Sequence, residues 1–312
     1  MIETTLRPAG PYRLERSVRG HTDATRRLEG GVLRLVLASG GCARVYQRVD
    51  GTLAAHLPTA TAEQAHEELR FLLCLDDDLR PFLRRAAQDP LLRDVATGQA
   101  GVRPVRVSTV AHALLRALSE QLITSREGRA IQGRFLRRHS PAVDDLRAPP
   151  TRDLLAGLSG AEVERSGLSG RRADALVRVP RFLDLEGLRR TSTAAVVRRL
   201  ERERTLGPWS AGVICVYGLG RWEHGLVGDL GLVRLLGALR GRRVEPAETA
   251  ALLEPWGEWA GLASLWLLRH PLAGQVGPPV LPDRRPARRP ARPARPEAWS
   301  RPSAARGIAG AR

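Results

Sequence analysis

Lysine is absent from this chain of 312 residues, and its absence excludes several chemistries. All 50 basic residues are arginine, against 33 acidic residues, which gives a formal net charge of +17. No lysine amine is available to form a Schiff base, to hold a pyridoxal cofactor or to complete a P-loop. Nucleic-acid binding is not excluded, because a guanidinium group pairs with phosphate through two parallel hydrogen bonds.

Two explanations of the arginine-only composition remain open. Codon usage in a GC-rich genome favours arginine together with Ala, Gly, Pro and Leu, and selection for phosphate binding would also favour it. The basic excess is not confined to the C-terminal segment 276–312, which carries nine arginines and two acidic residues. The preceding 275 residues contain 41 arginines against 31 acidic residues, as expected of a protein that neutralises phosphates.

Long apolar runs and clustered cysteines are also missing. No hydrophobic stretch reaches the roughly 18 residues of a membrane span, and the N-terminus lacks the apolar core of a signal peptide. We therefore expect a cytoplasmic, nucleoid-associated protein without a membrane partner. Cys42, Cys74 and Cys215 are too far apart to suggest a disulfide framework or a metal site, so each is expected to be a small buried apolar residue.

The hydrophobic periodicity changes along the chain. Residues 12–57 are typical of strands, with turn signals at Gly40-Gly41 and Asp50-Gly51. From residue 61 onward, apolar residues recur at helical spacing. The clearest predicted helices lie at 107–124, 208–219, 229–239, 246–254 and 257–270.

The sequence thus predicts an α+β fold in three parts. Residues 1–104 are expected to form a small α/β domain with an antiparallel sheet and flanking helices, and residues 105–275 an all-helical domain. Residues 276–312 are rich in Arg and Pro and are expected to be disordered. The arginines of this tail either add salt-dependent affinity for nucleic acid or have no function.

The most informative segment is 201–239. A tight turn at Thr205-Leu206-Gly207 separates two helices, and the second begins at Pro208, a residue suited to the first helical position. Backbone N–H groups at such a helix start are free to bind a phosphate. A further helix start follows at Gly228-Asp229-Leu230-Gly231.

These features resemble the helix-hairpin-helix DNA glycosylases, and most closely the branch of 3-methyladenine DNA glycosylase II, which removes alkylated bases. The run Leu206-Gly207-Pro208-Trp209-Ser210-Ala211 is similar to the end of its hairpin, and Asp229 to its acidic residue. Gln121-Leu122-Ile123 also resembles a motif of the branch. The pattern differs at Thr205, where a glycine is usual and where a β-branched residue does not readily take a positive φ.

The resemblance implies that Asp229 is the catalytic residue. Cleavage of an N-glycosidic bond produces an oxocarbenium-like sugar, which a carboxylate stabilises. One acid is sufficient when the base is alkylated and cationic, because such a base leaves without being protonated. The alternative is that Asp229 only caps the helix that follows it.

Trp209 and Trp259 are the implied base-pocket residues, since a cationic base stacks well on indole. Core packing is the alternative for both, and it is the expectation for Trp222, Trp256 and Trp266. Trp209 also stands where glycosylases with lyase activity carry a Schiff-base lysine. The resemblance therefore implies a monofunctional hydrolase that leaves an abasic site and needs no metal or other cofactor.

The remaining implied contacts are with the DNA itself. Leu122 would fill the gap left by a flipped base, and Gln121 would contact the orphan base. The alternatives are a core position for Leu122 and a backbone cap for Gln121. Thr205, Leu206 and Gly207 would bind a DNA phosphate. The expected partner is duplex DNA containing alkylated bases, and the protein is expected to be a monomer.

Two rival functions remain. A DNA-binding protein could use the same hairpin without catalysis, and the arginine-rich tail is compatible with this. A glycosylase for uracil or another neutral base would need a proton donor for the leaving base, and the sequence offers no obvious one.

Overall fold

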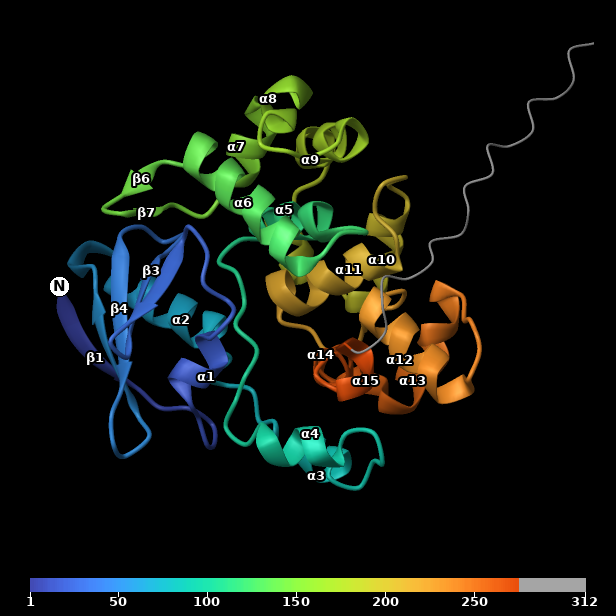
Figure 1. Cartoon of the computed structure of the whole chain (residues 1–312). Coiled ribbons are helices and arrows are strands. Elements are labelled where there is room, and N and C mark those ends of the chain that lie inside the picture. Colours follow the sequence, from blue (N-terminus) through green and yellow to red (C-terminus); the bar gives the residue numbers. More distant parts are fainter. Residues whose placement is uncertain (275–312) are drawn as a thin grey trace, which may run out of the picture. The chain divides into compact units, whose positions relative to one another are not determined.

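Five strands near the N-terminus form an antiparallel sheet in the order β1-β5-β4-β3-β2, coloured blue in Figure 1. The computed structural model describes residues 1–274. The strands are β1 Ile2–Leu6, β2 Arg26–Glu29, β3 Val32–Val36, β4 Cys42–Gln47 and β5 Leu53–Leu57. A second antiparallel pair is formed by β6 Ala142–Val143 and β7 Leu146–Arg147.

Strands β2, β3, β4 and β5 lie within the segment 12–57 that the sequence predicted to form strands. The turn between β4 and β5 is the predicted one at Asp50-Gly51, with Gly51 at φ 85°. The strand reading of 12–57 is wrong at Leu14–Val18, which forms the short helix α1. Strand β1 was not expected because it is held by β5 about fifty residues later, where Ile2 pairs with Leu57.

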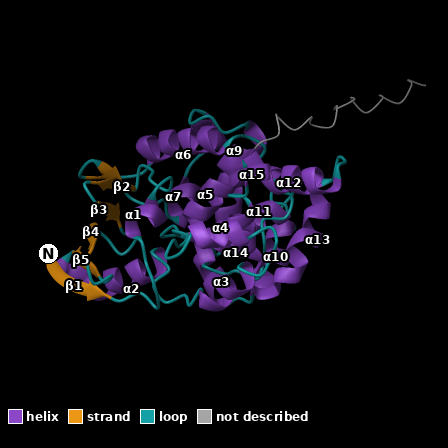
Figure 2. Cartoon of the chain, turned by 60° about the horizontal axis from the view of Figure 1, so that its bottom comes forward, coloured by secondary structure: helices purple, strands orange, loops and turns teal. Residues whose placement is uncertain are grey.

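Helices form most of the remaining described chain (Figure 2). The α-helices after α1 are α2 Ala62–Leu72, α3 Arg80–Ala86, α4 Arg93–Gly98, α5 Val110–Glu120, α6 Ser125–His139, α7 Arg152–Gly157, α8 Gly160–Glu164, α9 Gly170–Phe182, α10 Thr193–Glu201, α11 Pro208–Val213, α12 Leu230–Arg240, α13 Thr249–Leu253, α14 Ala260–Leu267 and α15 Pro271–Gly274. Short 3₁₀ helices are η1 Thr59–Thr61, η2 Glu186–Arg190, η4 Pro246–Glu248 and η5 Glu254–Trp259, and η3 Ile214–Leu219 is a π-helix.

Two of the predicted helices show how local sequence sets helix limits. The prediction at 208–219 is confirmed, as α11 continues directly into η3. The prediction at 107–124 is too long at both ends. The Thr109 side chain accepts a hydrogen bond from the His112 N–H and so fixes the start of α5. Thr124 forms a capping box with Glu127 and starts α6.

Two hydrophobic clusters hold the described chain together. The first lies between the sheet and α2 and includes Leu33 and Leu69. The second fills the helical part and includes Leu114 and Phe135. Phe82, from α3, belongs to the second cluster although it precedes residue 105. Residues 1–274 lie within one compact unit, and the expected boundary between 104 and 105 stays a prediction.

The mixed fold class is confirmed: a small antiparallel sheet precedes a helical region (Figures 1 and 2). The expected disordered tail lies outside the described residues. Cys74 and Cys215 are buried as expected, and Cys42 is partly exposed. None of the helices described within 1–274 combines the length and the apolar character needed to cross a membrane.

Candidate active site and DNA-binding hairpin

The predicted hairpin is present between α10 and α11. The Leu206 N–H donates to the Glu203 carbonyl at 2.8 Å, and the Leu206 side chain is buried in the helical core. Gly207 is exposed and caps α11 in an extended conformation. Thr205 is not among the residues with a positive φ. The turn is therefore made without a left-handed residue at 205, and the β-branched side chain creates no backbone strain there.

Gln121 fastens the end of α5 to this hairpin. Its side-chain Nε2 donates to the Thr205 carbonyl at 2.7 Å and to the Ser210 hydroxyl at 2.8 Å. Its own carbonyl accepts a hydrogen bond from Arg172 at 2.9 Å. The two alternatives for Gln121 were a backbone cap and a contact with the orphan base, and the structure shows a backbone contact, with the Thr205 carbonyl. Contact with an orphan base stays a proposal.

Leu122 projects from the surface in an unfavourable backbone conformation. Its side chain is 69 % exposed, and its φ is +57°. The alternative of an ordinary core leucine is therefore wrong. A left-handed conformation costs a bulky L-residue about 1–2 kcal/mol, and exposure of an apolar side chain adds to the cost. Strain of this kind occurs often at functional sites.

Asp229 and Trp209 are in direct contact. The Trp209 Nε1–H donates to Oδ2 of Asp229 at 2.8 Å, and the Gly231 N–H donates to Oδ1 at 2.8 Å. Asp229 is thus the N-cap of α12, as one reading predicted, and its second oxygen meets the residue that follows the hairpin turn. The two roles proposed for Asp229 are compatible, because the cap uses only one carboxylate oxygen.

The surroundings of Asp229 shift its titration. Burial raises the pKa of the Asp229 carboxyl above its ordinary value, while the hydrogen bonds from Trp209 and Gly231 oppose this rise. The negative charge of Glu120 raises the pKa further. Partial burial beside donor groups is the environment in which a carboxylate interacts strongly with a developing positive charge.

Trp259 lies in a separate aromatic cluster. Its ring centroid is 6.1 Å from that of Phe82, whose ring also packs on Trp256 at 5.5 Å and on Trp266 at 5.3 Å. Trp256 and Trp266 are buried, as is Trp222, so the core expectation for these three is confirmed. Trp259 is half-buried against the same core, and its contact with a base stays a proposal.

Sequence reasoning missed a polar stripe on α5. His112, Arg116 and Glu120 recur every fourth residue and therefore share one helix face. Oε1 of Glu120 accepts from Gln132 Nε2 at 3.0 Å and lies 3.5 Å from Nε of Arg116. Three titratable residues at this spacing in a largely apolar helix were the available signal, and they bring a second carboxylate toward Asp229.

Arg116 is held by an aromatic ring as well as by Glu120. Its guanidinium carbon lies 3.7 Å from the ring centroid of Tyr217, a buried residue of η3. This packing joins α5 to the helix that follows the hairpin. Within residues 1–274 there is no group of three or more His, Cys, Asp or Glu side chains suited to hold a metal ion.

Comparisons with known proteins agree with this architecture. A curated DNA-3-methyladenine glycosylase from Bacillus subtilis (strain 168) is 23% identical over 206 residues, which cover 62% of this chain and 68% of that protein. The 3-methyladenine DNA glycosylase from Archaeoglobus fulgidus superimposes with a TM-score of 0.72 at 18% identity, covering 85% of this chain and 96% of that one.

A third similar protein has been solved on DNA. The 8-oxoguanine glycosylase/lyase of Clostridium acetobutylicum, in complex with double-stranded DNA containing cytosine opposite 8-oxoguanine, has a TM-score of 0.72 at 15% identity, covering 85% of this chain and 93% of that one. No family model matches the sequence. The hairpin, the acid after it and these structural matches show that the chain has the fold of the helix-hairpin-helix DNA glycosylase superfamily.

Proposed function

We propose that the protein is a DNA glycosylase that excises alkylated bases of the 3-methyladenine type from duplex DNA and leaves an abasic site. The observation that carries this proposal is the contact between Trp209 and Asp229 directly after the hairpin turn. A non-catalytic hairpin protein needs the turn and its phosphate contacts. It does not need a half-buried carboxylate whose second oxygen is held by an indole.

The exposed groups have complementary tasks in this proposal. Thr205 and Gly207 offer backbone N–H groups to a phosphate at the start of α11, and Leu206 anchors the turn, since its N–H is bonded to Glu203 and its side chain is buried. Leu122 enters the duplex and occupies the space of the base that has rotated out. Leu122 is thus the wedge of the proposed complex. Because its neighbour Gln121 bonds to the Thr205 carbonyl, this wedge and the phosphate contact are held at a fixed separation.

The chemistry is assigned to Asp229. Its carboxylate stabilises the positive charge that develops on the sugar as the N-glycosidic bond breaks, and it orients the attacking water. The bonds from Trp209 and Gly231 favour the ionised form that this role requires. An alkylated, cationic base departs as a neutral molecule, so no proton donor is needed.

The electrostatics favour a cationic base. Glu120 adds a second carboxylate on the Asp229 side of α5, and Trp209 and Trp259 offer indole faces. A neutral base would gain less from the Asp229 carboxylate, whereas the charge of Glu120 is partly offset by Arg116. We therefore propose alkylated purines, rather than uracil, as the substrate class.

We further propose that the enzyme has no lyase activity. A lyase of this kind attacks C1′ with an amine, and the indole at position 209 has none. With no lysine in the chain, no neighbouring lysine can replace it. This separates the chain from the matched 8-oxoguanine glycosylase/lyase in its expected product.

The deciding experiment incubates the full chain with methylated duplex DNA and measures released bases by mass spectrometry. We expect release of 3-methyladenine by the wild type and a loss of at least 100-fold in Asp229→Asn. Asp153→Asn, at an exposed acid on α7, serves as the matched control and should retain full activity. Strand breaks should appear only after heating in alkali.

The other outcomes are equally clear. If the wild type binds the duplex but releases no base, the protein is a hairpin DNA-binding protein and the enzymatic proposal is wrong. If strands break without alkali, or if borohydride traps a covalent adduct, the monofunctional assignment is wrong.

A further inference from the structure

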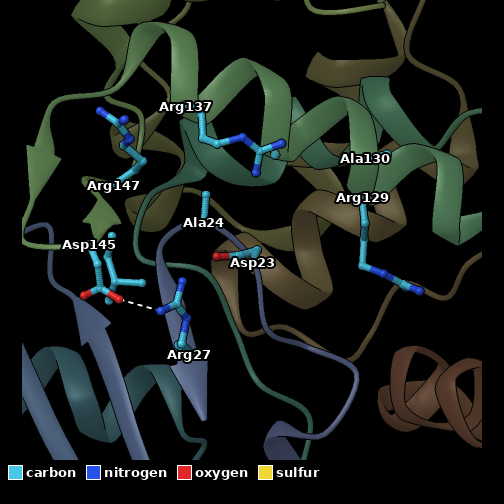
Figure 3. A pocket seen from close by; sticks show the side chains of 10 residues that line it. Asp23, Ala24, Arg27, Arg129, Ala130, Arg137, Asp145 and Arg147 are labelled. Carbon is cyan, nitrogen blue, oxygen red and sulfur yellow. Dashed lines mark hydrogen bonds and ion pairs between the residues drawn. The ribbon is translucent and has the colours of Figure 1, made fainter. Parts of the chain in front are cut away.

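A surface cavity of about 310 Å³, whose lining does not include Asp229, lies between the edge strand β2 and α6 (Figure 3). Its walls come from β2 and the segment before it, from α6, and from the β6–β7 hairpin. Its charged lining residues are Asp23, Arg27, Arg129, Arg137, Asp145 and Arg147.

Both acids of the cavity already have partners. Asp145 accepts hydrogen bonds from Arg27 Nη1 and from Arg34 Nη2, each at 2.5 Å, and Figure 3 shows the first of these as a dashed line. Oδ1 of Asp23 accepts from the Thr25 N–H at 2.7 Å and from its hydroxyl at 2.6 Å. The carboxylates are therefore not available to neutralise the other arginines.

Three guanidinium groups of the lining have no such partner. Within residues 1–274, the side chains of Arg129, Arg137 and Arg147 form no hydrogen bond or ion pair. Arg129 and Arg137 share one face of α6 with Gly133 between them. A Cβ at Gly133 would lie 3.1 Å from Nη1 of Arg137, so the glycine gives that guanidinium room beside the helix.

We propose that this cavity binds a phosphate group. Three unpaired guanidiniums around a concave surface form an anion site, and guanidinium is the side-chain group best matched to phosphate oxygens. The phosphate comes either from the DNA backbone or from a free phosphate-bearing molecule. This goes beyond the proposed function, because phosphate binding here requires no base excision.

The position of α6 favours the DNA backbone as the source. The helix begins at Ser125, three residues after Leu122. At 1.5 Å per residue, Arg129 and Arg137 lie about 6 Å and about 18 Å along the helix from its start. One strand of a duplex presents a phosphate about every 3.4 Å of axis. The phosphates next to a base flipped at Leu122 are therefore spaced closely enough to meet arginines about 6 Å and about 18 Å along α6.

The test compares Arg129→Ala, Arg137→Ala, Arg147→Ala and the triple variant with Arg138→Ala. Arg138 is exposed on the same helix, does not line the cavity and makes the same change of charge. Binding of an undamaged 20-bp duplex is measured over a salt series. Each lost phosphate contact should lower the salt slope by about 0.9, while Arg138→Ala should leave it unchanged.

Calorimetric titration with inorganic pyrophosphate tests whether the cavity binds a free phosphate-bearing molecule. Saturable binding by the wild type that is lost in Arg137→Ala, with an unchanged duplex slope, assigns the cavity to a free phosphate compound. If the cavity variants match Arg138→Ala in both measurements, the proposal is wrong. The single variants, checked by circular dichroism, keep the test valid if the triple variant does not fold. Absence of base excision by the wild type would overturn the proposed function and leave this result unaffected.

Discussion

The Trp209 indole N–H and the Asp229 carboxylate are 2.8 Å apart, although twenty residues separate them in the chain. One residue follows the hairpin turn and the other begins α12. Their hydrogen bond therefore couples the element proposed to bind phosphate to the acid proposed to act on the sugar. A change at either residue should affect both the position and the charge of the site.

Trp209→Phe should shift the pH dependence of base excision. The substitution keeps an aromatic ring but removes the donor that lowers the pKa of Asp229. That pKa, already raised by burial, should rise further, and the ionised acid should be lost at a higher pH. We expect the acidic limb of the single-turnover rate to move upward by roughly one pH unit, since one lost hydrogen bond to a charged group is worth about 1.5 kcal/mol. If the acidic limb does not move, the Trp209 indole does not influence the pKa of Asp229.

Leu122→Ala should separate duplex substrates from open ones. Because Leu122 is exposed, the free energy of unfolding should change by less than about 1 kcal/mol. Excision from a paired duplex should fall at least tenfold, and excision from single-stranded DNA should be nearly unaffected, because only the duplex has a gap to fill. Phe182→Ala, at another exposed apolar residue, is the control. Equal losses on both substrates would contradict the wedge role.

Gln121→Ala should loosen the hairpin. It removes the donor to the Thr205 carbonyl and to the Ser210 hydroxyl, and each bond contributes about 1 kcal/mol. Duplex affinity should fall about tenfold, and amide exchange at residues 205–210 should become faster. Gln121→Glu cannot donate to the carbonyl and should be no better than alanine. If exchange in the turn stays slow while only binding to an orphan base is lost, Gln121 acts on DNA directly.

His112 should make the protein less stable in acid. Burial lowers the pKa of His112 to about 4, and the charge of Asp23 offsets this only in part. The unfolded chain takes up a proton near pH 6.5, whereas the folded chain does not until about pH 4. The contribution of His112 to the free energy of unfolding should thus be constant above about pH 7. It should fall by about 3 kcal/mol as the pH drops from 6.5 to about 4.

Urea unfolding at several pH values tests this expectation. His112→Gln should show a smaller loss between pH 6.5 and pH 4, with the residual loss due in part to His21, whose pKa burial also lowers. A variant with the same pH dependence as the wild type would show that His112 does not carry the effect.

The parts of the fold that could be predicted are those fixed by neighbours in the sequence. The turn at Asp50-Gly51 and the helix at 208–219 depend on local residue types, and both were found. Strand β1 and the helix α1 depend on contacts across the fold, which periodicity does not encode. The end of α5 at Glu120, short of the predicted residue 124, was missed because the Thr124–Glu127 capping pattern, which starts α6, was given less weight than the apolar repeat.

The site shows the same division between motif and context. Asp229, Trp209 and Gln121 belong to recognisable runs, and the structure brings all three to the hairpin. The bond between Trp209 and Asp229 and those from Gln121 to Thr205 and Ser210 could not be predicted from spacing, because they join residues that are 20 to 89 positions apart. Glu120 was missed because its spacing with His112 and Arg116 lies within a helix whose apolar repeat dominates the pattern.

The bonds of Asp145 have a mechanical consequence. Through Arg27 and Arg34 this one residue of the β6–β7 hairpin ties two strands of the sheet to the helical region, and the Arg147 N–H adds a bond to the Ala24 carbonyl at 2.8 Å. These contacts hold the sheet against the helical region at the β6–β7 hairpin, although each exposed ion pair by itself contributes little to stability. In the proposed complex we therefore expect the DNA to deform more than this junction does, so duplexes with flexible steps beside the lesion should be repaired first.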